Sequence, residues 1–426
     1  SRTKILLGDH WAAFEQALQE ESPVSIRLNP FKQTDPETAG SLEKVPWASG
    51  ACYLPERPVF TLDPLLHAGC YYVQEASSMY LEQIICKHIS GKVRALDLCA
   101  APGGKSTHLS SLLPEGSLLV ANDVIRSRSR ILVENLAKWG NPHTIVTNCD
   151  PAVSGRLTGF FDLIVADLPC SGEGMFRKDP ASIAGWSVNN VRLCAERQRR
   201  IIADVWPALK TGGILIYSTC TYNREENEEN RDWICRDLGA ETIDGPHRFM
   251  PHLTKGEGFF IVALKRLSPN PAPKEKGGAG IPKLCASALP SPLKAGWEEG
   301  EFVFFSENNV FHAIPSVHRD DYFFLRKRLK MIAAGITLGE MKGRDFIPSA
   351  ALALSCRLPA NAFQVWEADR NTALKYLRKE ALQELPEVLP KGYILVTYRG
   401  FRLGFIKNIG NRANNLYPQE WRIRMA

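Results

Sequence analysis

The chain has 426 residues, of which 44% are hydrophobic and 23% are charged. This composition is typical of a globular protein, and the length predicts two to four domains at roughly 100 to 200 residues each. Disulfide-stapled miniproteins and disordered chains are therefore excluded. No run approaches the roughly 18 apolar residues of a membrane span, and residues 1–14 lack a signal-peptide pattern. We therefore expect a cytoplasmic protein with no membrane partner.

In chain order, residues 1–70 contain one predicted strand, PVSIRLNP, and indicate a small N-terminal domain. In residues 71–267, short Leu-rich or β-branched runs alternate with helical stretches, for example VRALDL, SLLVAND, HTIVTN, FDLIVADLP and GILIYST. This alternation predicts an α/β fold with a parallel, doubly wound, Rossmann-like sheet. The last run, GFFIVALKR after Gly258, is expected to close an edge of that sheet.

Residues 268–296 hold six prolines and four glycines, which predicts a linker. Residues 297–370 are expected to form an intermediate α/β domain that begins with the strand material EFVFFSENNVFHAI. Residues 371–426 include GYILVTYRGFRLGFIKN, predicted to be a hairpin that turns at Arg399-Gly400. No repeat and no heptad seam is present, so we expect a monomer.

The positive charge of the chain is concentrated at its end. The formal net charge is +6, and from Lys391 onward seven basic residues face one acid. Such a segment is typical of a surface that binds nucleic acid, although a basic solvated surface has the same composition. The eleven cysteines show no CxxC pair and no zinc-like spacing, so reduced thiols and no metal site are predicted.

The segment ALDLCAAPGGKST is an apolar strand followed by a small-residue turn and a helix start, which is typical of a nucleotide-type cofactor site. A dinucleotide fingerprint is absent, because Gly103 and Gly104 are adjacent and Pro102 has no amide hydrogen. A P-loop nucleotide hydrolase is the stronger rival, since Gly104-Lys105-Ser106 matches the end of its motif. The first glycine of that motif falls on Cys99, however, which opposes a phosphate cradle.

S-adenosylmethionine carries no phosphate, and it needs a close backbone approach and a carboxylate for its ribose hydroxyls. Asp123 follows the second predicted strand and is placed to supply that carboxylate. Asp150 follows the third strand and is placed to reach the adenine. A lone aspartate at either position would be read as a helix cap or turn residue. Three features at successive strand ends favour the cofactor.

Cys170 and Cys220 follow the fourth and fifth predicted strands, at the sheet edge where substrates bind in open α/β folds. Most cysteines are inert buried residues. Carbon-5 of a pyrimidine, however, is not nucleophilic enough to attack a methyl sulfonium unaided, and a thiolate that adds to carbon-6 activates it. Asp167 would hold the polar edge of the base, and Lys105 is expected to lower a thiol pKa. The acidic run NREENEEN is assigned a structural role at a helix start.

The segments CAAPGGKS, NDVIRSR, DLPCSGEGMFRKDP, YSTCT and YYVQEASS resemble the RNA 5-methylcytosine methyltransferases of the RsmB/NOP2/Sun type, over roughly residues 24–265. The resemblance implies that Cys220 is the nucleophile and that Cys170 assists product release. GFIKNIGNRANNLYPQEWRIR resembles the PUA-like end domain of the RsmF (YebU-like) branch, which methylates 16S ribosomal RNA. RNA is then the expected partner, with the basic end contacting phosphates.

The resemblance also implies a set of cofactor-contacting positions, with Arg128 as a weaker candidate: Cys99, Ala100, Ala101, Pro102, Gly103, Gly104, Lys105, Asp123, Asp150 and Asp167. Ser106 departs from the family, where many members have Thr. Two alternatives stay open besides the P-loop hydrolase. The core motifs are compatible with transfer RNA as substrate, and a ribosome-assembly factor without turnover could keep this fold and cofactor.

Overall fold

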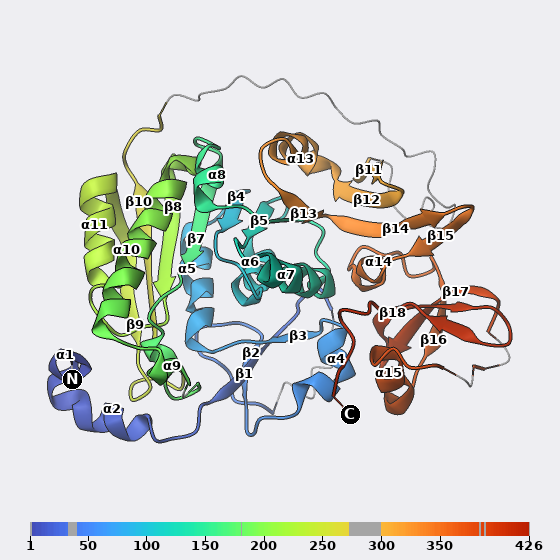
Figure 1. The fold of residues 1–426 in the computed structure, drawn as a ribbon, viewed down its shortest axis with the longest axis horizontal. Helices are drawn as coiled ribbons and strands as arrows, with labels where there is room; N and C mark the ends of the chain where they lie inside the picture. Colours follow the sequence, from blue (N-terminus) through green and yellow to red (C-terminus); the bar gives the residue numbers. More distant parts are fainter. Residues whose placement is uncertain are drawn as a thin grey trace.

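The structure is a computed structural model that describes residues 2–32, 41–179, 181–271, 300–382, 385–386 and 389–425. Its strands form four sheets: one of three strands, one of eight and two of four. Figure 1 shows the eight-stranded sheet with its helices on the left and the two smaller C-terminal sheets on the right. The predicted linker 268–296 lies largely in residues 272–299, outside the described residues.

Five parallel strands form the centre of the large sheet, in the spatial order β6-β5-β4-β7-β8. The central residues of these strands are mostly apolar because helices cover both faces of the sheet. They are β4 (Arg94–Asp97), β5 (Leu118–Asn122), β6 (Thr144–Thr147), β7 (Phe161–Asp167) and β8 (Leu209–Thr219). The predicted α/β, Rossmann-like fold is therefore confirmed.

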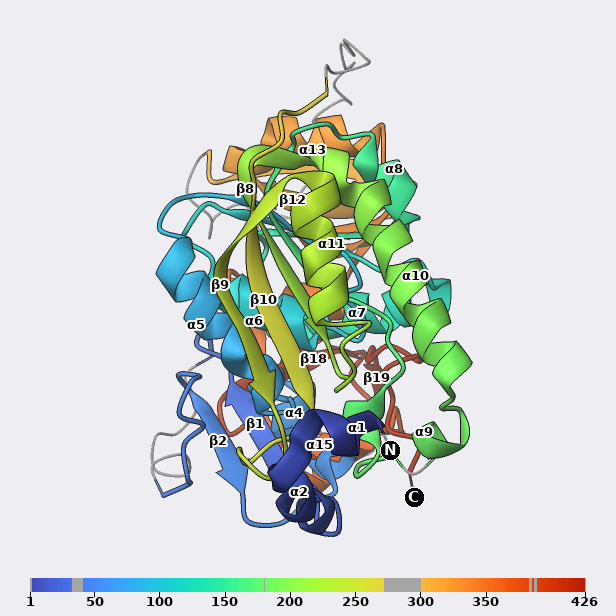
Figure 2. The same cartoon turned by 90° about the vertical axis from the view of Figure 1, so that its left-hand side faces the viewer.

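Antiparallel strands extend this sheet on both sides. β10 (Phe259–Arg266) pairs with β8 and also with β9 (Ala240–Phe249), so β9 forms that edge. The prediction that GFFIVALKR closes the sheet was wrong, because β9, whose sequence AETIDGPHRF has polar residues typical of an edge, covers it (Figure 2). At the other edge β13 (Met331–Ala334), from the segment predicted as the intermediate domain, pairs with β6.

Helices cover both faces of the large sheet. One face packs against α5 (Leu81–His88), α6 (Gly104–Leu112) and α7 (Arg126–Trp139), through residues such as Ile84, Leu109 and Leu132. The other face packs against α8 (Pro151–Gly155), α10 (Val188–Val205), α11 (Glu228–Leu238) and α13 (Arg319–Arg326), through residues such as Ile202, Ile234 and Phe323. The short helix α9 (Ala181–Ala184) precedes α10.

The N-terminal part consists of two short helices and a three-stranded sheet. α1 (Arg2–Leu7) and α2 (Trp11–Ala17) precede β1 (Val24–Leu28), which lies within the predicted strand PVSIRLNP. β1 pairs with β2 (Ala51–Leu54) and β3 (Tyr71–Val73), and α4 (Pro64–His67) lies between these two in the chain. Short 3-10 turns are η1 (Gly8–His10), η2 (Phe60–Leu62), η3 (Ser77–Tyr80), η4 (Glu173–Met175), η5 (Trp206–Ala208) and η7 (Ser316–His318).

The C-terminal part contains two further sheets. The first has the order β11-β12-β14-β15 and the second the order β16-β17-β18-β19, in which β17 and β18 form the predicted hairpin at Arg399-Gly400. The elements are β11 (Phe302–Glu307), β12 (Val310–Pro315), β14 (Ile336–Lys342), β15 (Asp345–Pro348), α14 (Ala350–Leu354), β16 (Gln364–Glu367), α15 (Arg370–Leu377), β17 (Gly392–Tyr398), β18 (Phe401–Asn408) and β19 (Ala413–Asn415).

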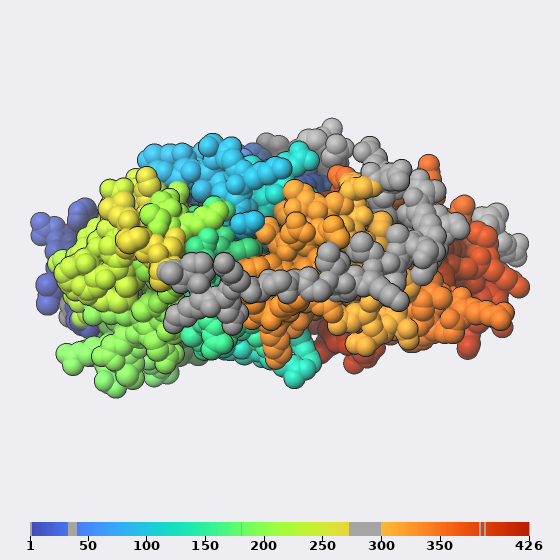
Figure 3. Space-filling model, turned by 90° about the horizontal axis from the view of Figure 1, so that it is seen from above, coloured from blue at the N-terminus to red at the C-terminus, as the bar shows by residue number. Residues whose placement is uncertain are grey.

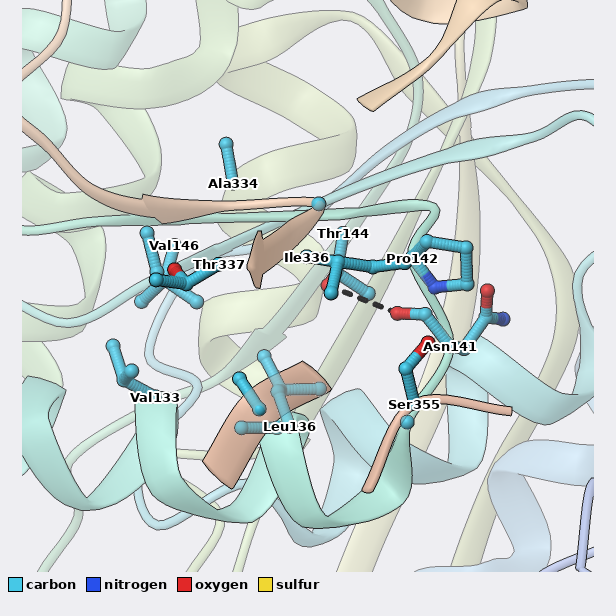
Figure 4. Close-up of a pocket in the computed structure, with 15 residues that line it drawn as sticks. Val133, Leu136, Asn141, Pro142, Thr144, Val146, Ala334, Ile336, Thr337 and Ser355 are labelled. Carbon is cyan, nitrogen blue, oxygen red and sulfur yellow. Dashed lines mark hydrogen bonds between the residues drawn. The ribbon is translucent and has the colours of Figure 1, made fainter. Parts of the chain in front are cut away.

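The C-terminal part packs directly against the core, as Figure 3 shows for its orange segment. Between α7, β6 and the β13–β14 junction lies a cavity of about 50 Å³ (Figure 4). Small and aliphatic residues such as Leu136, Val146 and Ala334 line it, and none of its lining side chains is ionisable. This cavity is a packing feature between two parts of the chain, and the reactive side chains lie elsewhere.

Candidate active site

The strand order of the large sheet determines where its functional loops meet. The chain runs outward from β4 through β5 to β6, then returns to place β7 on the other side of β4. At such a reversal the two loops at the carboxyl ends diverge, and ligands bind between them. Because β4 and β7 are adjacent strands, the loops that follow them lie on either side of one crevice, and the loop after β8 lies beside the loop after β7.

The loop after β4 is the predicted cofactor loop, and neighbouring elements hold it through its backbone. The Ala100 amide donates to the Asn122 carbonyl at 2.8 Å. The Ala101 carbonyl accepts from Arg128 at 2.6 Å, and the Pro102 carbonyl accepts from Asn135 at 2.7 Å. Gly103 then takes a φ of +120°, which only glycine adopts readily, and α6 begins at the next residue.

Three acids lie around this loop in different environments. Asp97, which no sequence pattern singled out, is fully buried; Ser106 donates to one of its oxygens at 2.6 Å and the other has no partner among the described residues. Burial raises the pKa of Asp97 to about 7. Asp123 is also buried, 3.6 Å from Arg128. Asp150 is exposed and caps α8 through the Ala152 amide, the structural role that a lone aspartate suggests.

Asp167 ends β7 and links the cofactor loop to the neighbouring strand. Its carboxylate accepts from Lys105 and from the Ser218 hydroxyl, both at 2.8 Å. Burial opposes the positive charge on Lys105, but Asp167 outweighs it and the pKa of Lys105 is raised. About a third of the Asp167 side chain stays exposed, so its oxygens can still accept from a ligand.

Cys170 and Cys220, predicted from two separate strand ends, lie with their sulfur atoms 3.1 Å apart. The hydrogen bond to Cys220, then burial, raises the pKa of the Cys170 thiol well above its usual range. The expectation that a positive field lowers a thiol pKa is therefore wrong for Cys170, because the hydrogen bond to Cys220 and burial both raise it. Burial likewise raises the pKa of Cys99, which makes it an unreactive thiol.

Two buried glutamates tie the two cysteine loops together in reciprocal fashion. Glu226, which follows Cys220, accepts from the Ser171 amide at 3.0 Å. Glu173, which follows Cys170, accepts from the Tyr222 amide at 2.9 Å. Each loop thus sends a carboxylate to the backbone of the other, which determines the distance between the thiols. The run NREENEEN was predicted only to start a helix, and the buried position of Glu226 was missed because sequence spacing does not reveal a partner 55 residues away.

The same loops pack too closely for larger residues. A Cβ on Gly174 would lie 2.4 Å from the Gly258 carbonyl oxygen and 2.9 Å from that of Cys220. Arg177 and Glu257 form a buried ion pair beside this contact, and Arg177 also donates to the Ala17 carbonyl of α2 at 3.1 Å. The motif residues Gly174 and Arg177 therefore position the Cys220 loop and attach the N-terminal helices to it.

Arg27 of β1 connects the N-terminal sheet to the start of α6 and was also missed. It is 2% exposed and donates to the Gln74 side chain at 3.0 Å, the Gly104 carbonyl at 3.2 Å and the Thr107 hydroxyl at 2.7 Å. Its guanidinium lies 4.6 Å from the centre of the Trp139 ring. A buried arginine in the predicted strand PVSIRLNP is an anomaly that the sequence alone could have flagged.

Comparison with known families matches three parts of the chain. Residues 88–265 match the family described as 16S rRNA methyltransferase RsmB/F. Residues 1–76 match the N-terminal domain of 16S rRNA methyltransferase RsmF, and residues 363–423 match the methyltransferase RsmF PUA domain.

Curated relatives align over almost the whole chain. Ribosomal RNA small subunit methyltransferase F of Pectobacterium atrosepticum is 30% identical over 98% of this chain and 92% of its own length. The protein of the same name from Salmonella heidelberg is 30% identical over 96% of this chain and 92% of its own length.

Two solved structures share the fold of the core. The methyltransferase homolog protein from Pyrococcus horikoshii is 27% identical, with a TM-score of 0.55 over 62% of this chain and 93% of its own. NSun6 from Pyrococcus horikoshii with SFG is 21% identical, with a TM-score of 0.53 over 62% of this chain and 96% of its own.

The fold, the loop after β4 and these matches define an S-adenosylmethionine-dependent methyltransferase with a C-terminal PUA domain. The residues present suit that cofactor: Asp97 has a buried oxygen without a partner, which a cationic ligand would satisfy, and Gly103 keeps side-chain bulk away from the loop. More particularly, the chain belongs to the ribosomal RNA small subunit methyltransferase F family.

Neither a metal-binding cluster nor a membrane-spanning helix is found in the part of the chain that the structure describes. There, no cluster of three or more His, Cys, Asp or Glu side chains is arranged to hold a metal ion. Over the same residues, no helix combines the length and the apolar character needed to cross a membrane.

Proposed function

We propose that this protein methylates carbon-5 of cytosine in RNA, with 16S ribosomal RNA as the substrate, through a covalent adduct between Cys220 and the base. The observation that carries the proposal is the pair of thiols, Cys170 and Cys220, 3.1 Å apart at the carboxyl ends of adjacent strands. A thiol nucleophile with a second thiol beside it suits a reaction in which a sulfur must first attack a ring and later leave it. The relatives named above, ribosomal RNA small subunit methyltransferases, support the choice of RNA.

In the proposed reaction the Cys220 thiolate forms a bond to carbon-6, and the ring electrons move so that carbon-5 becomes nucleophilic. S-adenosylmethionine, when bound, supplies the methyl group that carbon-5 accepts. Cys170, whose pKa is raised, keeps its proton and donates it in a hydrogen bond to the neighbouring sulfur. After methyl transfer a water molecule accepts the carbon-5 proton, the electrons of that C–H bond re-form the double bond between carbon-5 and carbon-6, and the bond to Cys220 breaks to return the thiolate. Cys170 assists this release.

Asp167 is proposed to hold the base during these steps. Its carboxylate is fixed by Lys105 and Ser218 and is partly exposed at the end of β7, next to the loop that carries Cys170. A carboxylate oxygen there can accept a hydrogen bond from the exocyclic amine of cytosine. The target base must leave its stack to reach this edge, so an RNA loop or an assembling ribosomal subunit is the expected substrate.

The cofactor is proposed to bind along the loop from Cys99 to Lys105, with Asp123 on the ribose hydroxyls. Asp123 is buried, and its carboxylate accepts one close hydrogen bond, from the Ile125 amide at 2.8 Å. Its contact with Arg128 is longer, at 3.6 Å, so the carboxylate can accept further hydrogen bonds from a ligand. Asp150 is proposed to lie at the adenine side, with part of its carboxylate used to cap α8. Asp97 is added as the carboxylate for the amino group of the cofactor.

The C-terminal domain is proposed to contact RNA phosphates, although not all of its cations are available. Lys407 forms an ion pair with Asp345, and Arg402 donates to the Ser355 carbonyl at 3.3 Å. Of the seven cations from Lys391 onward, five are left for RNA: Lys391, Arg399, Arg412, Arg422 and Arg424. We expect a monomer that acts in the cytoplasm, where ribosomal RNA is found.

The test combines methyl transfer with detection of the adduct. Purified protein is incubated with S-adenosylmethionine and unmodified 16S ribosomal RNA, and bisulfite sequencing locates the product. C220A is expected to abolish transfer and C170A to accumulate a covalent protein–RNA complex on denaturing gels. C194A, which removes a buried thiol of α10, is the matched control and should behave as the wild type. Transfer by C220A, or no adduct with C170A, would contradict the mechanism, and transfer only to transfer RNA would contradict the substrate.

A further inference from the structure

The start of α7 carries an unusual group of exposed residues next to the proposed cofactor site. Arg126, Arg128 and Arg130 occupy three of its first five positions and are all exposed. Around them Val124, Ile125 and Ile131 are 56%, 48% and 48% exposed. We call the surface formed by residues 124–131 the α7 ledge.

The arginines of the α7 ledge stand where a helix disfavours positive charge. Unpaired amide groups give a helix N-terminus a partial positive charge, and cations there destabilise it. The first turn of α7 contains no acid, and the residue before it, Ile125, has no side chain that can cap the helix. The position of Arg126, the first residue of the helix, is thus unfavourable for the folded chain alone, and it becomes favourable once an anion lies against it.

Two of the three arginines, Arg126 and Arg130, form no ion pair with the described residues of the chain. Arg128 donates to the Ala101 carbonyl of the cofactor loop and lies near Asp123, so it belongs to the site already described. For Arg126 and Arg130, one helical turn apart, no carboxylate lies within ion-pair distance among the described residues. Glu134, one turn beyond Arg130, is held by Lys138 at 2.5 Å.

The α7 ledge also lies on the route between the proposed active site and the C-terminal domain. α7 has 14 residues, which corresponds to about 21 Å of helix. Its first turn contacts the cofactor loop through Arg128, and at its other end Lys138 lies 5.6 Å from the centre of the Trp421 ring. Trp421 is followed directly by Arg422 and Arg424 of the C-terminal domain.

We propose that the α7 ledge binds the sugar–phosphate backbone of the substrate RNA, between the base that is methylated and the segment held by the C-terminal domain. Arg126 and Arg130 neutralise phosphates, and the aliphatic side chains of Val124, Ile125 and Ile131 cover ribose or base faces. The complementarity of charge selects a polyanion, and the position beside the cofactor loop selects the polyanion that is the substrate. This inference rests on the proposed function.

The experiment compares two double charge reversals of equal size. R126E/R130E changes the α7 ledge, and R197E/R200E changes two exposed arginines on α10. Affinity for fluorescently labelled 16S ribosomal RNA is measured by anisotropy at several salt concentrations. R126E/R130E is expected to weaken binding at least tenfold and to reduce the slope of log affinity against log salt by about 1.4, since each phosphate contact in single-stranded RNA contributes about 0.7. R197E/R200E should change affinity much less.

Two further measurements separate this proposal from a folding defect and from the proposed function itself. Acids favour a helix N-terminus, so the melting temperature of R126E/R130E should equal or exceed that of the wild type. Its affinity for S-adenosylhomocysteine should be unchanged, because Arg128 is kept. An unchanged salt slope, or an equal loss of RNA affinity in the two variants, would overturn the proposal that the α7 ledge binds RNA. Failure of the wild type to methylate any RNA would instead overturn the proposed function.

Discussion

The link between Arg27 and the cofactor loop leads to a prediction about cofactor affinity. The change is Arg27→Met, which keeps most of the buried stem and removes the guanidinium. Two of the three hydrogen bonds of that group reach the first turn of α6, at Gly104 and Thr107, and the third reaches Gln74. The variant should therefore lose stability and also bind the cofactor less tightly, because the end of the cofactor loop loses its support.

The expected loss of stability follows from the hydrogen bonds that each partner of Arg27 keeps in the variant. The Thr107 hydroxyl donates to the Gly104 carbonyl at 3.0 Å, so these two groups keep each other as partners, and only the side-chain oxygen of Gln74 loses the one donor recorded for it. A charged hydrogen bond to a buried group contributes about 1.5–3 kcal/mol, so a total loss of about 2–4 kcal/mol in the free energy of unfolding is expected. A loosened first turn of α6 should weaken cofactor binding by about tenfold, which corresponds to about 1.4 kcal/mol.

Arg266 offers a matched control. It is 3% exposed, lies 5.4 Å from the centre of the Trp206 ring, and donates to the Trp206 and Leu209 carbonyls at 2.6 and 2.8 Å. Arg266→Met should therefore cost similar stability with no contact to the cofactor loop. Calorimetry with S-adenosylhomocysteine measures affinity, and thermal unfolding without ligand measures stability. Arg27→Lys, which keeps the charge and one donor group, should bind the cofactor with intermediate affinity.

The reasoning is refuted if Arg27→Met binds S-adenosylhomocysteine within twofold of the wild type at a temperature where both are folded. It is equally refuted if Arg266→Met weakens binding as much, because loss of global stability would then explain both.

Two further predictions concern the ionisable groups of the site. The pKa of Asp97 is about 7, so its carboxyl group is mostly protonated at pH 6 and ionised at pH 8. The ammonium group of the ligand favours the ionised form, and S-adenosylhomocysteine should bind up to about tenfold more tightly at pH 8; a D97N protein that keeps this pH dependence in calorimetry would disprove the assignment. Hydrogen peroxide, itself reduced to water, should oxidise Cys170 and Cys220 to a disulfide that dithiothreitol reverses. Peptide mapping without reductant must then find the cross-link between residues 170 and 220, and its absence after full inactivation would contradict the thiol geometry.

The sequence was sufficient wherever the information is local. An apolar run predicts a buried strand, a small-residue turn predicts a loop, and chemistry-bearing residues directly after parallel strands must share one edge of the sheet. On that basis Cys170, Cys220 and Asp167 could be placed together from residue order alone. The hairpin at Arg399-Gly400 was equally predictable, because the turn residues and the flanking strands are neighbours in the chain.

The assignment of edges failed for a reason that is also physical. GFFIVALKR is apolar as far as Leu264 because β10 has a neighbour on each side, and its neighbour β9 has a mixed sequence without a clear alternation. The strand β13 was not predicted from the sequence, for a different reason. It consists of four residues, and its pairing with β6 joins segments about 185 residues apart, a contact that no local pattern encodes.

The sequence by itself determined the class of fold, the cofactor loop and the two thiols, since each depends on residue type and on order along the strands. Only the tertiary structure decided what holds these groups in place. Glu173 and Glu226 each accept a hydrogen bond from the backbone of the other cysteine loop. Arg27 donates a hydrogen bond from the N-terminal sheet to α6, and Lys407 forms an ion pair with Asp345. Each of these contacts involves a partner distant in the chain, and the two partners come together only when the sheets pack.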